Sequence, residues 1–96
     1  MLTQFSRTQL LYGPGAMEKL ARSRVAVFGL GGVGGYVTEA LARSGVGQLD
    51  LIDNDKVSLT NLNRQILATH ATVGEYKTDA AAARVRDINP ACVVRT

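Results

Sequence analysis

The segment 29–34 reads GLGGVG, a glycine pattern suited to binding phosphate. Gly29, Gly31 and Gly34 allow a tight turn, close approach of the backbone to a phosphate and close packing of a helix on a strand, because no Cβ stands in the way. The helix expected next directs free N–H groups and its positive dipole end to the same place, which favours an anion. Asp53 follows about 20 residues later, where a carboxylate can accept hydrogen bonds from ribose hydroxyls. These residues predict a nucleotide site of unspecified type, and the alternative is that the glycines serve packing alone.

The elements that must position these residues form a strand, helix, strand unit. An apolar strand at 25–28, which we expect to be buried, runs into the glycines, and a second apolar strand ends at Asp53. Gly45 is placed to cap the end of the helix between them. Helical spacing predicts one apolar face on this helix, made of Val33, Val37, Ala40 and Leu41. These flanking elements make the glycine motif more specific than a lone GxGxxG.

Two shorter regions lie on either side of this unit. Residues 1–13 are expected to form a short helix or an arm, and Pro14 suits the first turn of the next helix. After the second strand comes a polar, turn-rich stretch. A short helix is then expected at 62–67, with Thr60 or Asn61 as its cap.

The remaining sequence predicts the rest of a parallel sheet. The alanine-rich segment 75–88 predicts a helix with Ala81, Val85 and Ile88 on one face, and 91–95 predicts a third strand. The element order predicts an α/β fold, the N-terminal half of a Rossmann-like doubly wound parallel sheet with about three strands and flanking helices. Such a half-sheet has an uncovered face, so we expect a fragment of a longer protein. Self-association is the other way to cover that face.

Composition limits the class of protein. The chain has 96 residues, 46% of them hydrophobic, which predicts one small globular domain. Its net charge of +3 comes without a Lys/Arg block, so a nucleic-acid surface is permitted but not indicated. The single Cys92 excludes an internal disulfide, suits a reducing, cytoplasmic setting and is expected to be a packed thiol. His70 lacks a metal partner at ligand spacing, and the short apolar runs predict neither a signal peptide nor a membrane span.

A second set of polar residues follows the first, namely Asp55, Asn61, Arg64, Gln65 and Lys77. With them, the segments GLGGVG, LIDNDKVSLTNLNRQ and VGEYK resemble the ATP-binding core of the adenylating superfamily that includes ubiquitin-activating enzymes and sulfur-carrier adenylyltransferases. The segments FSRTQLLYG, ALARSGVGQLDLIDNDKV, TNLNRQI and INPAC are most similar to its tRNA threonylcarbamoyladenosine dehydratase branch, with the molybdopterin and thiamine sulfur-carrier enzymes as the alternative. Residues 1–96 are therefore expected to be the N-terminal part of a single ATP-binding adenylation domain, whose remainder is absent from this chain.

The resemblance implies roles for individual residues. It implies ATP as the cofactor, with Mg²⁺ held by a ligand outside this chain. By analogy, Gly32 and its neighbours approach the nucleotide with their backbone, and Asp53 holds the ribose. Asn61, Arg64 and Lys77 match family positions that contact phosphates, where Arg64 supplies a planar donor fork and Lys77 a mobile charge.

Three further positions carry weaker expectations. Arg7 matches an arginine that reaches into the partner's site in dimeric relatives, which implies a homodimer and a catalytic arginine supplied in trans. Asp55 orients a group near the metal or makes an Asx turn, and Gln65 bonds the nucleotide or caps the short helix. The plain alternatives are solvated helix charges at Arg64 and Lys77 and a disordered terminal charge at Arg7.

These features leave four functions open. The first is ATP-dependent cyclising dehydration of threonylcarbamoyladenosine, with tRNA as the substrate. The second is adenylation of a ubiquitin-like sulfur-carrier protein. The third is a nicotinamide-dependent oxidoreductase, which would use the glycine loop and Asp53 but has no need of Arg64 and Lys77 at a triphosphate. The fourth is a nucleotide-binding module without catalysis, and these 96 residues alone are expected to be inactive.

Overall fold

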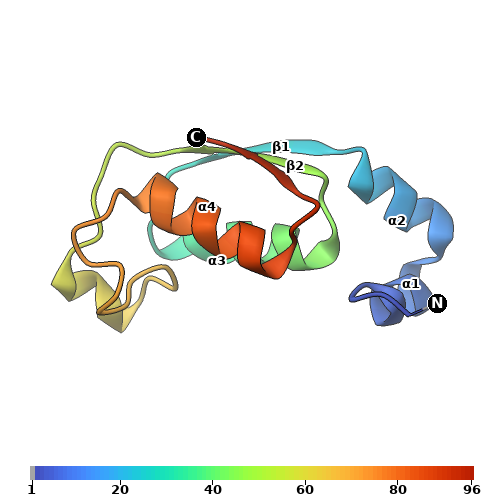
Figure 1. Cartoon of the computed structure of the whole chain (residues 1–96), viewed down its shortest axis with the longest axis horizontal. Coiled ribbons are helices and arrows are strands. Elements are labelled where there is room, and N and C mark those ends of the chain that lie inside the picture. Colours follow the sequence, from blue (N-terminus) through green and yellow to red (C-terminus); the bar gives the residue numbers. More distant parts are fainter. Residues whose placement is uncertain (1) are drawn as a thin grey trace.

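Three parallel strands and the helices that cover one of their faces make up the computed structural model, which describes residues 2–96 (Figure 1). In chain order the elements are α1 (Ser6–Tyr12), α2 (Pro14–Ala21), β1 (Arg24–Phe28), α3 (Gly32–Ser44), β2 (Gln48–Ile52), the 3-10 helix η1 (Leu59–Asn63), α4 (Lys77–Ile88) and β3 (Val93–Arg95). The strand order is β1-β2-β3, with Val27 beside Leu51 and Leu49 beside Val94. The predicted α/β fold with three parallel strands is confirmed.

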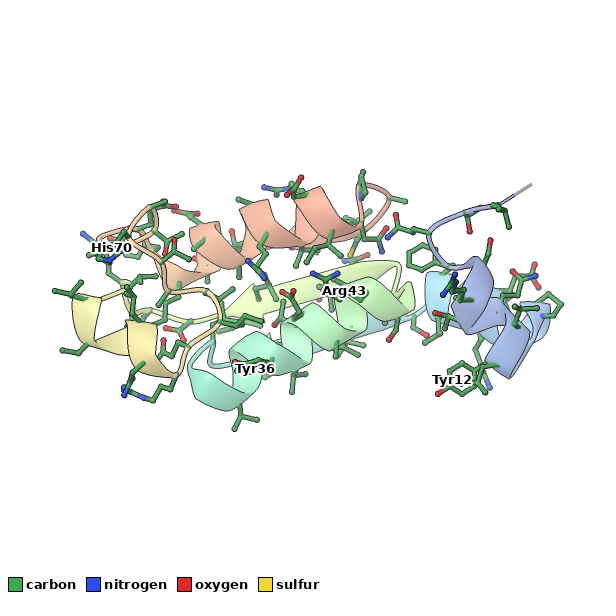
Figure 2. The ribbon with its side chains drawn as sticks, turned by 90° about the horizontal axis from the view of Figure 1, so that it is seen from below. Tyr12, Tyr36, Arg43 and His70 are labelled. Carbon is green, nitrogen blue, oxygen red and sulfur yellow. The ribbon has the colours of Figure 1, made fainter. Side chains whose placement is uncertain are left out.

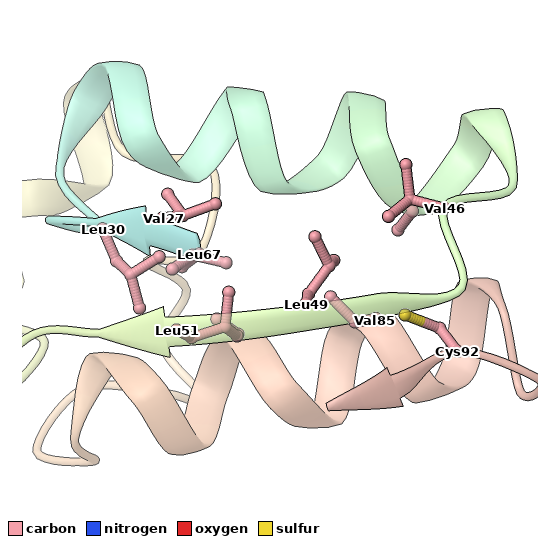
Figure 3. Close-up of a cluster of buried hydrophobic side chains, with 10 residues drawn as sticks. Val27, Leu30, Val46, Leu49, Leu51, Leu67, Val85 and Cys92 are labelled. Carbon is pink, nitrogen blue, oxygen red and sulfur yellow. The ribbon is translucent and has the colours of Figure 1, made fainter. Parts of the chain in front are cut away.

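The core lies between the sheet and the two long helices α3 and α4, which run side by side on the same face (Figures 1 and 3). Strand residues alternate between the two faces, so Val27 and Leu51 are buried and pack with Leu30, Val46, Leu49, Leu67, Val85 and Cys92. Phe28, on the opposite face, is 79% exposed, and Ala26 is exposed as well. The interpretation of 25–28 as a uniformly buried strand is therefore wrong, because no helix among residues 2–96 covers that second face.

Helix α3 buries a different face from the one that its apolar residues predict. The predicted face is wrong because the structure leaves Val33, Val37 and Ala40 exposed and Leu41 only half-buried. The buried positions are instead Gly35, Thr38 and Ala42. These small residues bring the helix axis close to the sheet and to the loop after η1, where a Cβ at Gly35 would meet Ile66 Cγ2 at 3.2 Å. Gly45 ends the helix in the left-handed conformation, as predicted, with φ +96°.

The boundaries of two helices differ from the predicted ones because loop hydrogen bonds intervene. Helix α4 begins at Lys77 and not at residue 75, since Glu75 O accepts from Val57 N at 2.8 Å and holds that segment extended. The short helix is η1 at 59–63 and not at 62–67. It begins after Ser58, whose N–H donates to Asn61 Oδ1 at 2.9 Å. The buried face of α4 includes Ala81 and Val85, as predicted.

The N-terminal helices α1 and α2 pack at one end of the elongated molecule (Figure 1). Pro14 occupies the first turn of α2, as predicted. Phe5 and Met17 lie 3.5–3.6 Å from the place of a Cβ at Gly45, which brings them against the turn after α3. Neither helix contains a buried residue. Within residues 2–96 no helix is long and apolar enough to cross a membrane.

Candidate nucleotide-binding site

The predicted site residues gather mainly at the carboxyl ends of β1 and β2. The glycine loop follows β1, Asp53 follows β2, and the first turns of α3 and α4 begin at the same end of the sheet (Figure 1). Open parallel sheets bind ligands in the crevice at this edge, because loops and helix N-termini meet there. The fold therefore places the candidate residues where a nucleotide site is expected.

The glycine loop has the geometry that two of its three glycines predict. Gly29 has φ +88°, and its N–H donates to Ile52 O at 2.8 Å, which ties the turn to β2. A Cβ at Gly34 would lie 1.7 Å from Gly29 O, so any larger residue would push α3 away from the loop. The tight turn and the close helix packing are confirmed. The approach of a phosphate to the backbone stays a prediction.

The start of α3 has the donors and the space that an anion requires. The N–H groups of Gly32, Val33 and Gly34 have no hydrogen-bond acceptor among residues 2–96. A Cβ at Gly32 would meet nothing within 4 Å, so the backbone is open to the outside there. Free N–H groups at a helix start carry partial positive charge and bind phosphate oxygens. The loop therefore has the donors and the space that binding of a phosphate group requires.

Asp53 is half-buried and joins two loops. Its Oδ2 accepts a hydrogen bond from Leu30 N at 2.7 Å, and its Oδ1 accepts one from Asp55 N at 2.7 Å. Burial raises the pKa of Asp53, but the two N–H donations and the charge of Lys77 outweigh burial, so the pKa lies below its ordinary value. Asp53 is therefore a carboxylate at neutral pH. The Asx turn is made by Asp53, while Asp55 has an exposed side chain.

Lys77 is a buried residue at the first position of α4. The residue is 7% exposed, and within the described chain no salt bridge includes it. Its N–H donates to Asp55 O at 2.9 Å, and its charge acts on Asp53, which places the ammonium near that carboxylate. No side-chain nitrogen or oxygen in the described chain is both fully buried and without a hydrogen-bond partner, so the Lys77 ammonium reaches the surface while the rest of its side chain is buried. Lys77 is therefore not an ordinary surface side chain of α4, and its ammonium is accessible to a ligand.

Gln65 and Asn61 are also buried, and they differ in what they touch. The Gln65 amide Nε2 lies 3.7 Å from the place of a Cβ at Gly31, so this side chain faces the glycine loop. Asn61 Oδ1 accepts from Ser58 N at 2.9 Å, which makes it a structural part of η1. Gln65 is thus brought to the site, and the Asn61 amide oxygen is engaged in the local turn.

Arg64 is exposed, and its guanidinium is turned back onto η1. Its Nη1 donates to Asn63 Oδ1 at 2.8 Å and to Thr60 O at 3.2 Å. No hydrogen bond or ion pair joins Arg64 to Asp53 or to the glycine loop within residues 2–96. The predicted contact of Arg64 with a phosphate therefore stays a prediction.

Arg7 lies away from the other candidate residues. It is an exposed residue of α1, which packs at the opposite end of the long axis from the glycine loop (Figure 1). His70 and Tyr12 mark these two ends, the first near η1 and the second on α1 (Figure 2). The structure therefore does not bring Arg7 into the site of its own chain.

Two interactions near the site have no signal in the local sequence. Lys56 Nζ lies 4.9 Å from the Tyr76 ring centroid, where an antiparallel bridge pairs these two residues beside Asp55. Glu39 of α3 accepts hydrogen bonds from Arg84 of α4 at 2.6 and 3.1 Å, which ties the two helices together. Both pairs are separated by 20 or more positions, so spacing along the chain could not have indicated them.

The other chemically reactive residues stay outside the site. Within residues 2–96 no three His, Cys, Asp or Glu side chains are grouped to hold a metal ion. His70 is exposed, and Cys92 is buried in the core, where burial raises the pKa of the thiol. Cys92 is the packed thiol that the sequence predicts.

Comparisons with known proteins agree with this geometry. The ThiF family profile matches residues 5–96. A tRNA threonylcarbamoyladenosine dehydratase from Bacillus subtilis is 54% identical over 94 residues, covering 98% of this chain and 37% of the relative. A molybdopterin-synthase adenylyltransferase from Salmonella typhimurium is 51% identical over 73 residues, covering 76% and 29%. The crystal structure of the tRNA N6-threonylcarbamoyladenosine dehydratase of E. coli in complex with ATP is similar with a TM-score of 0.94 and 47% identity, covering 96% of this chain and 38% of that one. The chain therefore spans about a third of the length of these relatives.

Proposed function

Because this chain belongs to the ThiF family, we propose that residues 1–96 are the N-terminal part of a single adenylation domain, which activates a carboxylate with ATP. The ATP complex of the similar E. coli structure supports the choice of nucleotide. The observation that carries the proposal is the buried, unpaired Lys77, held beside Asp53 at the carboxyl edge of the sheet. A nicotinamide site has no use for such a cation, so the oxidoreductase alternative is disfavoured.

The proposed substrate is threonylcarbamoyladenosine in tRNA, whose carboxylate is activated before cyclisation and loss of water. The dehydratase from Bacillus subtilis at 54% identity supports this substrate. The second candidate is the C-terminal carboxylate of a ubiquitin-like sulfur-carrier protein. The 51% identity to the Salmonella adenylyltransferase over 73 residues supports that alternative.

Different residues of this chain bind different parts of the nucleotide. ATP supplies the adenylyl group: a carboxylate oxygen bonds to the α-phosphorus as the bond from that phosphorus to pyrophosphate breaks. The N–H groups of Gly31 and Gly32 and the first turn of α3 bind phosphate oxygens, and the Lys77 ammonium neutralises their charge. Asp53 accepts from the ribose, and Gln65 lies against the nucleotide next to the glycine loop. These contacts hold the reacting phosphate in line with the carboxylate.

Further groups complete the proposal. Arg64 turns from η1 toward the phosphates when ATP is bound, and Asn61 and Asp55 keep its loop in place. Arg7 acts in the site of a second chain, so the enzyme works as a homodimer. The position of α1 at the far end of the molecule supports an action in trans. Mg²⁺ is held by a ligand outside residues 1–96, and the protein works in the cytoplasm.

The test is adenylation by the full-length protein. We expect AMP and pyrophosphate to form from ATP when tRNA carrying threonylcarbamoyladenosine is added. Lys77→Ala and Arg64→Ala should each lower the rate on the order of 100-fold, because each removes charge stabilisation at the phosphates. Lys19→Ala, at an exposed lysine of α2, is the matched control and should leave the rate unchanged. AMP formation that needs a carrier protein and not tRNA would favour the second candidate.

A mixing experiment tests Arg7. Arg7→Ala and Lys77→Ala are each expected to be weakly active alone. If Arg7 acts in the partner's site, a mixed dimer contains one site with both groups intact, so combining the two variants should restore part of the activity. Unchanged low activity after mixing would contradict the action in trans.

A further inference from the structure

Asp53 connects two segments that both belong to the candidate site. Its Oδ2 accepts from Leu30 N in the glycine loop, and its Oδ1 accepts from Asp55 N in the loop after β2, both at 2.7 Å. Asp55 in turn accepts from Lys77 N at 2.9 Å through its carbonyl oxygen. One carboxylate therefore links the loop that approaches a phosphate to the first residue of α4.

We propose that Asp53 is a positioning residue that holds the glycine loop and the start of α4 at a fixed separation, in addition to any contact with a ribose. The proposal rests on the proposed function only for the identity of the nucleotide. Leu30 is fully buried, and its N–H stands directly before the glycines that face the ligand. A buried N–H without an acceptor is unfavourable, so loss of the carboxylate would allow this loop to rearrange.

A carboxylate is needed at this position because two N–H groups approach it from different sides. An ionised aspartate offers two accepting oxygens, whereas asparagine offers one oxygen and a donating NH₂ group. Asparagine at position 53 would therefore accept a hydrogen bond from one of the two N–H groups, while its own NH₂ group would face the other N–H group without an acceptor between them. Each carboxylate oxygen has a second lone pair, so Asp53 can hold both loops and still accept a ribose hydroxyl. The ionised state that this requires agrees with its lowered pKa.

The first experiment uses the unmodified chain and needs no variant. The amide resonances of Leu30 and Asp55 are followed by NMR as the pH is lowered. Both are expected to shift together with one midpoint below the ordinary pKa of an aspartate, because protonation of Asp53 removes an acceptor from them. Two amides that do not titrate, or that titrate with different midpoints, would overturn the proposal.

The second experiment separates positioning from ribose binding. Binding of ATP and of 2′,3′-dideoxy-ATP is measured by calorimetry for the unmodified protein and for Asp53→Asn. Positioning predicts that Asp53→Asn weakens both nucleotides by about tenfold, the effect of one lost hydrogen bond to a charged group. Asp50→Asn is the control in β2, the strand that precedes Asp53, where Asp50 pairs with Arg24 outside the site. It should bind both nucleotides with unchanged affinity.

The outcomes distinguish the two proposals. A loss confined to ATP, with dideoxy-ATP unaffected by Asp53→Asn, would mean that Asp53 serves the ribose alone and would overturn the positioning role. Unchanged binding of both nucleotides would overturn it as well. If the unmodified full-length protein binds neither nucleotide, the proposed function fails, while the NMR titration still decides whether Asp53 holds the two loops.

Discussion

The two ends of this elongated molecule are built in different ways. At the carboxyl end of the sheet, polar side chains are held within the structure: Asp53 is half-buried and accepts two loop hydrogen bonds, and Lys77 is buried. At the other end, α1 and α2 contain no buried residue and expose the apolar side chains of Leu10, Leu11 and Tyr12. A cleft of about 450 Å³ lies there, between the N-terminal segment, α2 and the turn at Gly45.

The difference indicates that the end of the molecule with the candidate site is rigid, whereas the end with α1 and α2 is less stable against local opening. Buried polar groups with fixed partners make a rigid site, which reduces the reorganisation needed to bind charge. Exposed apolar helices with few buried contacts open at low free energy. We therefore expect substitutions at the site end to change folding or nucleotide binding strongly, and substitutions of the exposed apolar residues of α1 to change neither.

The largest effect is expected from Gly34→Ala. A Cβ there would lie 1.7 Å from Gly29 O, so α3 must move away from β1, and the free energy of unfolding should fall by about 3 kcal/mol or more. Gly32→Ala is the matched control, because its Cβ would meet nothing within 4 Å. Urea unfolding followed by circular dichroism measures both. Equal stability of the two variants would contradict the close packing of the glycine loop.

The contrast between the two ends is tested by removing one apolar side chain from each. Val85→Ala, in the core between α4 and the sheet, should lower the free energy of unfolding by about 2 kcal/mol through the cavity that it leaves. Leu11→Ala, at a residue 74% exposed, should change it by less than about 0.5 kcal/mol. Urea unfolding followed by circular dichroism measures the free energy of unfolding of both variants. A comparable loss in both would show that α1 is packed as tightly as the core.

Lys77→Met sharpens the distinction between stability and function. The substitution nearly keeps the length of the buried side chain and removes a charge that has no ion pair among residues 2–96. The stability measured by thermal unfolding should therefore change by less than about 1 kcal/mol, while ATP binding is lost. The exposed Lys19→Met is the control and should change neither. A larger loss of stability would mean that the Lys77 ammonium stabilises the fold as well as binding ATP.

The smallest effect concerns the ion pair between α3 and α4. Bonds from Arg84 lower the pKa of Glu39, against the raising effect of burial, with Arg43 contributing as well. A carboxyl whose pKa is lower in the folded state adds stability above its unfolded pKa and loses it as the pH falls through the folded value. Glu39→Gln should therefore cost about 1 kcal/mol at pH 7 and almost nothing below about pH 3.

The matched control for this pair is Glu18→Gln, at an exposed glutamate of α2. It should show no pH-dependent difference from the unmodified protein in the same unfolding experiments. A constant deficit of Glu39→Gln at every pH would assign the loss to packing and not to charge.

Local rules were sufficient for the element order and for the glycine loop. The apolar strands, the glycines at 29 and 34, the cap at Gly45 and the buried Ala81 and Val85 all follow from backbone sterics and periodicity, which act over a few residues. The predicted apolar face of α3 is wrong, because that prediction considers only how hydrophobic each side chain is and not whether it is small enough to fit against the sheet. The structure buries Gly35 and Thr38 instead, since a helix lying this close to the sheet has room only for small side chains.

The sequence by itself determined the fold class, the family and the types of residue available for chemistry. Only the tertiary structure decided which of them meet. It joined Asp53 to Leu30 and buried Lys77, left the Arg64 guanidinium on η1, and placed α1, with Arg7, at the far end. The physical reason is that periodicity and backbone sterics act between neighbours along the chain, whereas these contacts join residues brought together only when parallel strands align and the helices pack across them.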